Sequence, residues 1–254
     1  MKTLAVIPAR YASTRFPGKP LALLGGKPIV QWVWERVCRF DDGVDAIIAT
    51  DDGRIADMAE QQFDANVMLT SADCQSGTDR CGEVLQRLTR ENGACYDIVV
   101  NIQGDEPFVD PTQLRALTAA FSDPEVQIAT LRTRITSTGE LLSPNNVKVV
   151  CSDRGNALYF SRQPLPHRRG EAESEWLAHG EYYKHVGIYA YRAPVLEQLC
   201  QLPVGTLEAC EKLEQLRWLA AGYTIRVVDT EHANIGIDTP EDLVEAEKTL
   251  NRQK

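Results

Sequence analysis

Several signatures of common protein classes are missing from this sequence of 254 residues. Neither a GxGxxG fingerprint nor a GxxxxGK[ST] motif occurs, which argues against the usual dinucleotide and P-loop phosphate sites. A nicotinamide-dependent dehydrogenase is disfavoured for the same reason, because no glycine fingerprint follows the first predicted strand. No stretch approaches the roughly 20 apolar residues that span a bilayer, and no signal-peptide pattern opens the sequence. We therefore expect a soluble, cytoplasmic protein without membrane partners.

Cysteine pairs with metal-ligand spacing and an excess of basic residues are missing as well. The seven cysteines are odd in number, and no two have CxxC spacing, so the sequence predicts neither a disulfide framework nor a zinc site. The net charge of −9 argues against nucleic acid as a partner, because binding a phosphate backbone needs a broad basic surface. A hydrophobic fraction of 43% and a charged fraction of 25% are typical of a soluble globular protein.

A basic loop near the N-terminus stands out on this acidic chain. It follows residues 4–7, a predicted buried strand that Pro8 is expected to end, because proline has no N–H to donate. The loop carries Arg10, Arg15 and Lys19 among small residues that include Ala9, Ala12, Ser13, Thr14 and Gly18. Three neighbouring cations repel one another, so they gain most when a multiply charged anion lies between them. This predicts a small anionic ligand in a cleft; the alternative is a solvated basic loop.

Apolar runs and helical periods alternate through the first half of the chain. Strands are predicted at residues 44–50, 67–69 and 96–102. Helices are predicted from Pro28 as the first helical residue, and at 54–62, 79–90 and 110–121. This order indicates a mostly parallel sheet covered on both faces.

In the second half of the chain, predicted strands and helices alternate less regularly. Strands are predicted close together at residues 126–134, 147–151 and 157–161, which favours an antiparallel section. Two further strands are predicted at 183–191 and 224–228. Residues 163–180 lack a period and predict a mobile flap or loop. One helix is expected at 207–221 with Leu213, Leu216 and Leu219 inward, and a final helix from the Thr239–Asp242 cap. We see no repeat or linker, which predicts one domain (1–254) with a smaller lobe embedded in its second half.

Two carboxylates stand next to predicted elements. Asp105 follows the strand at 96–102 directly after Gly104, whose backbone permits a sharp turn, and Asp238 precedes the final helix. Magnesium takes one or two protein carboxylates together with water and substrate phosphates. Asp105 and Asp238 supply that number if the fold brings them together, and otherwise Asp238 is a turn or capping residue.

Eight motifs occur together in one order and carry a family resemblance. They are IPARYASTRFPGKPL (7–21), SGTDR (76–80), NIQGDEP (101–107), NVKVV (146–150), LYFSR (158–162), KHVGIYAYR (184–192), EKLEQLR (211–217) and GIDTPEDL (236–243). In these motifs the chain resembles the 3-deoxy-manno-octulosonate cytidylyltransferases, or CMP-Kdo synthetases. The match covers nearly the whole chain.

The resemblance implies a fold and a reaction. The fold is a three-layer, Rossmann-like nucleotidyltransferase α/β fold with a mostly parallel central sheet and a smaller antiparallel lobe for sugar binding and dimerisation. The reaction is CTP + 3-deoxy-D-manno-octulosonate (Kdo) giving CMP-Kdo + diphosphate, an activation step for the lipopolysaccharide inner core. Dependence on Mg²⁺ and a homodimer are also implied.

The resemblance also assigns roles to residues at matching positions. Arg10 and Lys19 match positions that bind the triphosphate, Ala9 and Arg15 share their loop, and Asp105 and Asp238 match the metal-binding aspartates. Arg80 and Gln103 fall where the family lines the nucleotide pocket, Gln103 also on the sugar side. The positions that hold the sugar acid are matched by Arg162, His185, Tyr189, Glu214 and Gln215.

Each sugar-side residue also has a structural interpretation. Arg162 can pair with a surface acid, His185 can be a core histidine, and Tyr189 can serve packing, as strand aromatics usually do. Glu214 and Gln215 can face water from the helix of Leu213 and Leu216. Other functional hypotheses are a cytidylyltransferase for 8-amino-Kdo or a sialic acid, and an inactive nucleotide-binding regulator, which the retained aspartates and basic loop disfavour.

Overall fold

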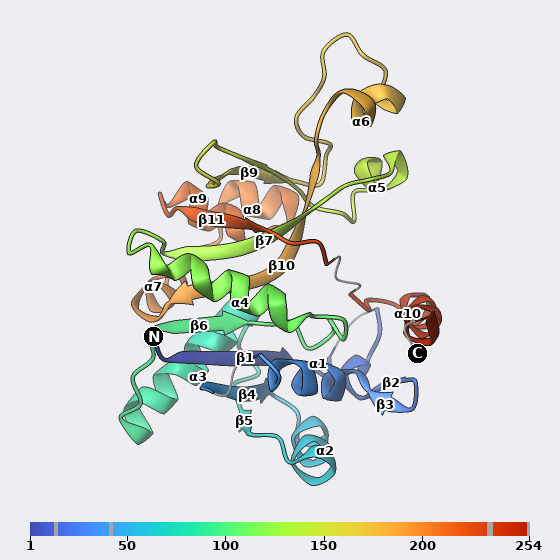
Figure 1. Ribbon diagram of the computed structural model, residues 1–254. Coiled ribbons are helices and arrows are strands. Elements are labelled where there is room, and N and C mark those ends of the chain that lie inside the picture. The colour runs from blue at the N-terminus through green and yellow to red at the C-terminus, as the bar shows by residue number, and fades with distance from the viewer. Residues whose placement is uncertain (13–14, 41–42, 233–235, 253–254) are drawn as a thin grey trace. The chain divides into compact units, whose positions relative to one another are not determined.

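The protein is described by a computed structural model over residues 1–12, 15–40, 43–232 and 236–252 (Figure 1). The chain forms two compact units. The first comprises Met1–Arg115, Tyr191–Cys200 and Asn234–Lys254, and the second comprises Ala116–Ala190 and Gln201–Ala233. That both act as one domain with an embedded lobe stays a prediction. None of the described helices is long and apolar enough to cross a membrane.

A parallel sheet forms the centre of the first unit. Its strands lie side by side in the order β6 (Ile98–Asn101), β1 (Thr3–Ala9), β4 (Val44–Thr50) and β5 (Val67–Leu69) (Figure 1). The helices that contact these strands are α1 (Ile29–Val37), α2 (Gly53–Phe63), α3 (Gly77–Asn92) and α7 (Ala193–Leu199), and α10 (Pro240–Arg252) belongs to the same unit. Every residue of β1 is buried, as expected for a central strand covered on both faces. The predicted strand–helix alternation is confirmed.

Strand β1 continues through Pro8, so the prediction that Pro8 ends it is wrong. Pro8 pairs with Ala49 of β4, and β1 ends one residue later. The carbonyl of Pro8 accepts a hydrogen bond from Gly104 N at 3.1 Å, so its nitrogen faces the β6 side of the strand. Pairing with β6 has already ended at Val6–Asn101. The missing N–H therefore costs no ladder hydrogen bond.

The Thr239–Asp242 cap predicted for the final helix is confirmed, whereas α3 begins at Gly77, two residues before its predicted start at 79. Ser76 and Asp79 form a capping box at the start of α3. At the start of α10, Thr239 N donates to Asp242 Oδ2 at 2.9 Å, and Asp242 N donates to Thr239 Oγ1 at 3.2 Å. Pro28 is the residue before α1 rather than its first helical residue. The remaining short elements of this region are η1 (Lys19–Leu21), β2 (Leu23–Leu24), β3 (Lys27–Pro28) and α4 (Pro111–Ala119), which crosses into the second unit.

The second unit has a mixed sheet. Its strands follow the order β11 (Ile225–Asp229), β7 (Ile128–Arg134), β10 (Tyr183–Arg192), β8 (Lys148–Cys151) and β9 (Ala157–Ser161). The β10–β8–β9 pairings are antiparallel and β11–β7 is parallel. The predicted antiparallel section is confirmed. Its helices are η2 (Ala120–Ser122), α5 (Thr138–Leu142), η3 (Glu173–Glu175), α6 (Trp176–His179), α8 (Thr206–Glu211) and α9 (Gln215–Ala220).

Two predictions for the second unit are corrected. Residues 163–180 are not all loop, because they include η3 and α6, and Trp176 is buried with Leu141 and Tyr182 in a small apolar cluster. The single helix predicted at 207–221 is two helices, α8 and α9, separated where Lys212 takes a left-handed conformation (φ 55°). The break rotates α9, so Trp218 is fully buried and Leu219 only partly.

Candidate active site

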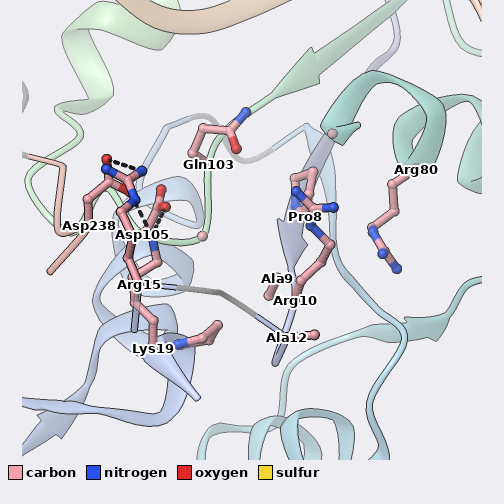
Figure 2. Close-up of a pocket in the computed structure, with 13 residues that line it drawn as sticks. Pro8, Ala9, Arg10, Ala12, Arg15, Lys19, Arg80, Gln103, Asp105 and Asp238 are labelled. Carbon is pink, nitrogen blue, oxygen red and sulfur yellow. Dashed lines mark hydrogen bonds and ion pairs between the residues drawn. The ribbon is translucent and has the colours of Figure 1, made fainter. Parts of the chain in front are cut away.

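A cavity of about 400 Å³ opens at the carboxyl-end edge of the parallel sheet in the first unit (Figure 2). Strands β1, β4 and β6 run parallel, so the residues that follow them emerge at one edge, where such folds bind ligands. The cavity is lined by Pro8, Ala9, Arg10, Ala12, Arg15, Lys19, Pro20, Gly77, Arg80, Gln103, Gly104, Asp105 and Asp238. It contains every residue predicted for the nucleotide and metal site.

The basic loop is folded back on itself at Gly18. Gly18 has a φ of 71°, a conformation that favours glycine, and its N–H donates to Tyr11 O at 2.9 Å. The Tyr11 ring lies against Gly18 on one side and 3.3 Å from the Arg54 guanidinium carbon. This turn brings Lys19 into the cavity with its side chain only 10% exposed. Within the loop, Ser13 and Thr14 lie outside the described residues.

Lys19 links the two predicted metal aspartates. Its Nζ contacts Asp105 Oδ2 and lies 3.1 Å from Asp238 Oδ1, and Arg15 Nη2 lies 3.0 Å from Asp238 Oδ2. Figure 2 shows these four side chains gathered at one side of the cavity, with Arg10 and Arg80 across from them. The structure therefore brings Asp105 and Asp238 together.

Backbone contacts explain how segments so distant in sequence meet. Ile237 N donates to Asp105 O at 3.0 Å, and the Ile237 side chain is fully buried in an apolar cluster with Leu250 of α10. Thr239, not Asp238, caps α10 with its side chain. The interpretation of Asp238 as a helix cap is therefore wrong, and its carboxylate faces the cavity.

Gly104 sets the position of Asp105. A Cβ at this residue would lie 2.8 Å from the Pro8 backbone oxygen, closer than real Cβ contacts. Only glycine lets the turn after β6 press against the end of β1. Asp105 is thereby held beside the basic loop, as the sequence predicted.

Arg80 lies across the cavity from the aspartates (Figure 2), and Gln103 also lines the cavity. Arg80 is fully buried; its guanidinium donates to Thr70 Oγ1 and, at 3.1 Å, to Asp51 Oδ2. No described residue accepts a hydrogen bond from its Nε. Gln103 Nε2 lies 3.4 Å from Asn101 Oδ1. The sequence analysis assigned no role to Asp51. The pattern that could have identified it is an acidic residue directly after a strand, here β4, because Asp105 was singled out as an acidic residue that follows a predicted strand.

The donor set fits a magnesium ion. Asp105 and Asp238 direct carboxylate oxygens toward a common cation, the Lys19 ammonium, and oxygen is the donor that Mg²⁺ prefers. Among the described residues, no group of three or more His, Cys, Asp or Glu side chains is placed to hold a metal ion. Two carboxylates are the number Mg²⁺ uses when substrate phosphates complete its shell.

In the second unit, Arg162 is fixed by backbone groups rather than by a surface acid. Its Nε donates to Glu211 O at 2.8 Å and its Nη1 to Pro144 O at 3.1 Å. Its own N–H donates to the Glu211 carboxylate at 3.0 Å. Carbonyl oxygens orient the guanidinium without cancelling its charge, so the cation remains available to an anion.

His185 lies next to Tyr189, another of the predicted sugar-side residues. Its ring lies 5.3 Å from the Tyr189 ring, and Tyr189 lies 5.1 Å from Trp218 of α9, the helix that begins with Gln215 after Glu214. Burial raises the pKa of Tyr189 well above its usual value, with the Glu214 carboxylate adding to the rise. Gln215 is 5% exposed, so the interpretation that it faces water is wrong. The structure therefore places Tyr189 beside His185 and Glu214 close enough to Tyr189 to affect its pKa, and it buries Gln215 on the helix that carries Trp218. The roles of these residues stay predictions.

Fold and site define a nucleotidyltransferase, and comparison with known proteins gives the family. A model of the cytidylyltransferase family matches residues 4–226. The chain belongs to the cytidylyltransferase family. The expected fold class is therefore confirmed.

The full-length relatives are more specific. A 3-deoxy-manno-octulosonate cytidylyltransferase of Bacteroides thetaiotaomicron is 50% identical over 100% of both chains. Another, of Phocaeicola vulgatus, is 51% identical over 100% of this chain and 99% of its own. The solved structure of a CMP:2-keto-3-deoxy-manno-octonic acid synthetase complexed with CTP has a TM-score of 0.87 at 40% identity, covering both chains fully. The resemblance indicated by the eight motifs is confirmed.

Proposed function

We propose that this protein activates Kdo: CTP + Kdo gives CMP-Kdo + diphosphate. The observation that carries the proposal is the convergence of Arg10, Arg15, Lys19, Asp105 and Asp238 on one cavity. It occurs in a chain about half identical, over its full length, to proteins named for this reaction. Three cations and two carboxylates that line the same cavity are complementary to a triphosphate bound together with a divalent cation.

Positioning and charge account for the chemistry that such a site performs. The anomeric hydroxyl oxygen of Kdo bonds to the α-phosphorus, the bond from that phosphorus to the β-phosphate bridging oxygen breaks, and the hydroxyl proton passes to solvent. Diphosphate leaves with the bonding electron pair. Arg10, Arg15 and Lys19 line the cavity proposed to receive the triphosphate, and their positive charges stabilise the charge that grows on the departing diphosphate.

Magnesium is the cofactor we propose for this site. Asp105 and Asp238 would hold it, and when bound it would polarise the α-phosphate and neutralise charge. Lys19 then has two roles in sequence: its ammonium compensates the two carboxylates before the nucleotide enters, and it contacts phosphate oxygens afterwards. Both roles follow from a side chain that reaches Asp105 and Asp238 from a buried stem.

The sugar acid is proposed to bind in the second unit. Kdo carries a carboxylate, for which the backbone-held Arg162 guanidinium is the complementary group. His185, Tyr189, Glu214 and Gln215 are the proposed polar contacts to the rest of the sugar. We further propose a cytoplasmic homodimer acting in lipopolysaccharide inner-core synthesis; light scattering on the purified full chain tests the dimer.

The decisive experiment measures diphosphate release from CTP by the purified protein. Release that requires both Kdo and magnesium supports the proposal. Release that needs no sugar, or no release at all, contradicts it. Parallel assays with 8-amino-Kdo and a sialic acid test the alternative that the protein activates another sugar acid. If kcat/KM is higher for either of these sugars than for Kdo, that sugar becomes the assigned substrate.

A further inference from the structure

A buried threonine hydroxyl in β7 has three close polar neighbours on β10. Thr130 is fully buried, and its Oγ1 lies 2.9 Å from His185 Nε2, 2.9 Å from Ile188 O and 3.2 Å from Val186 O. All of these groups belong to the second unit. Among the described residues, this hydroxyl is the only hydrogen-bonding group in contact with a ring nitrogen of His185.

Counting protons decides which atom donates to which. A threonine hydroxyl has one proton and two lone pairs, whereas a backbone carbonyl only accepts. The contacts to Ile188 O and to His185 Nε2 are both of hydrogen-bond length, so each needs a proton. Thr130 supplies the proton to the carbonyl, because the carbonyl cannot. The proton between Thr130 and His185 must then come from His185 Nε2.

The opposite tautomer leaves a clash of lone pairs. If Nε2 of His185 were unprotonated, Thr130 would have to donate to it. The hydroxyl oxygen would then face the carbonyl oxygens of Ile188 and Val186 at 2.9 and 3.2 Å with no proton in either contact. Such an arrangement leaves buried oxygen atoms facing one another without a shared proton, which is unfavourable. The structure therefore favours a proton on Nε2.

The remaining ring nitrogen is left as an acceptor. Burial lowers the pKa of His185 to about 3, so the ring is neutral and carries a single N–H. With that proton on Nε2, Nδ1 has a lone pair. The ring is held edge-on by Phe160 at 5.1 Å and lies 5.3 Å from Tyr189, which restricts its rotation.

We propose that Thr130 is a positioning residue that fixes His185 as the Nε2–H tautomer, so that Nδ1 accepts a hydrogen bond from a hydroxyl of the sugar acid. The identity of that ligand rests on the proposed function; the tautomer does not. His185 in this state neither adds positive charge nor donates from Nδ1 to a carboxylate. Nδ1 of His185 therefore binds a hydroxyl group of the sugar, and Arg162 binds the sugar carboxylate.

The tautomer is read directly by nuclear magnetic resonance on the full chain labelled with ¹⁵N-histidine. The chain has four histidines, and the His185 signals are those lost in His185→Gln. We expect a protonated Nε2 and an unprotonated Nδ1 in the wild type and in Thr130→Ser, which keeps the hydroxyl. Thr130→Val, of nearly the same shape, should lose this preference. A proton on Nδ1 in the wild type, or an unchanged tautomer in Thr130→Val, would overturn the proposal.

Kinetics supply the second readout. Losing the orientation of one hydrogen bond predicts that Thr130→Val raises KM for Kdo about threefold to tenfold. KM for CTP should stay at the wild-type value, and Thr130→Ser should restore KM for Kdo. A rise in both KM values, or no rise in either, would contradict a positioning role. If Kdo is not a substrate of the wild type, the proposed function fails, and the resonance experiment still decides the tautomer.

Discussion

Replacing Lys19 by methionine removes the ammonium that lies between Asp105 and Asp238 while keeping the apolar stem. Among the described residues, the two carboxylates would then keep one ionic partner, Arg15, which lies 3.0 Å from Asp238. We expect Lys19→Met to fold, to lose stability in the absence of metal, and to recover part of that stability when Mg²⁺ is added.

The size of the loss follows from the exposure of the three side chains. Breaking a fully buried ion pair costs about 3–5 kcal/mol, and breaking an exposed pair costs about 0–1 kcal/mol. Lys19 is 10% exposed, but Asp105 is 28% and Asp238 50% exposed. We therefore expect a loss of about 2 kcal/mol, which lowers the midpoint of thermal unfolding by about 4–8 °C for a chain of this length.

Magnesium should restore stability because it binds the bare carboxylates of the folded state. At ten times its Kd, a ligand of the folded state alone adds about 1.4 kcal/mol. Thermal unfolding with and without Mg²⁺ measures this, and the gain should be larger in Lys19→Met than in the wild type, where the ammonium competes. The assay needs no substrate, so it is independent of turnover.

The matched control is Lys27→Met. Lys27 also pairs with a carboxylate, Glu35 at 2.6 Å, but both side chains lie outside the cavity and are about equally exposed (29% and 28%). We expect a loss of about 1 kcal/mol or less and no magnesium-dependent recovery. Equal stability of Lys19→Met and the wild type, or an equal magnesium effect in both lysine variants, would refute the reasoning.

Four further predictions test other parts of the site. Asp105→Asn should lower kcat at least a hundredfold while thermal unfolding changes by only a few degrees; near-normal turnover would remove the metal role. Arg10→Ala should raise KM for CTP and lower kcat, and unaffected steady-state kinetics would count against the triphosphate site. Because burial lowers the pKa of His185 from 6.5 to about 3, its neutral form adds stability that is fully present above pH 6.5 and is lost as pH falls toward 3. Acid unfolding of His185→Gln against the wild type measures that loss, and KM for Kdo should show no histidine titration between pH 6 and 8. Gly104→Ala should cost about 1–3 kcal/mol, since the added Cβ would meet a backbone oxygen of β1, whereas Gly53→Ala, with open space around it, should be nearly neutral in denaturant titrations.

The sequence by itself determined the local structure and the chemistry offered at the strand ends. The apolar runs at 44–50 and 67–69 became β4 and β5 with the predicted limits. The capping residues Thr239 and Asp242 marked the start of α10. These features depend on neighbours a few residues apart, so a linear pattern contains them. The basic loop was equally visible, because its charges are contiguous in the chain.

Tertiary structure alone decided which distant groups meet. Asp105 and Asp238 come together through one backbone hydrogen bond and the burial of Ile237, contacts that no periodicity encodes. Pro8 stays in β1 because β6 stops pairing before it, and the helix predicted at 207–221 breaks at Lys212, where no glycine signals a left-handed turn. The tautomer of His185 likewise depends on a threonine in another strand. Each outcome is set by packing between segments far apart in sequence, and long-range contacts override local preference where the two disagree.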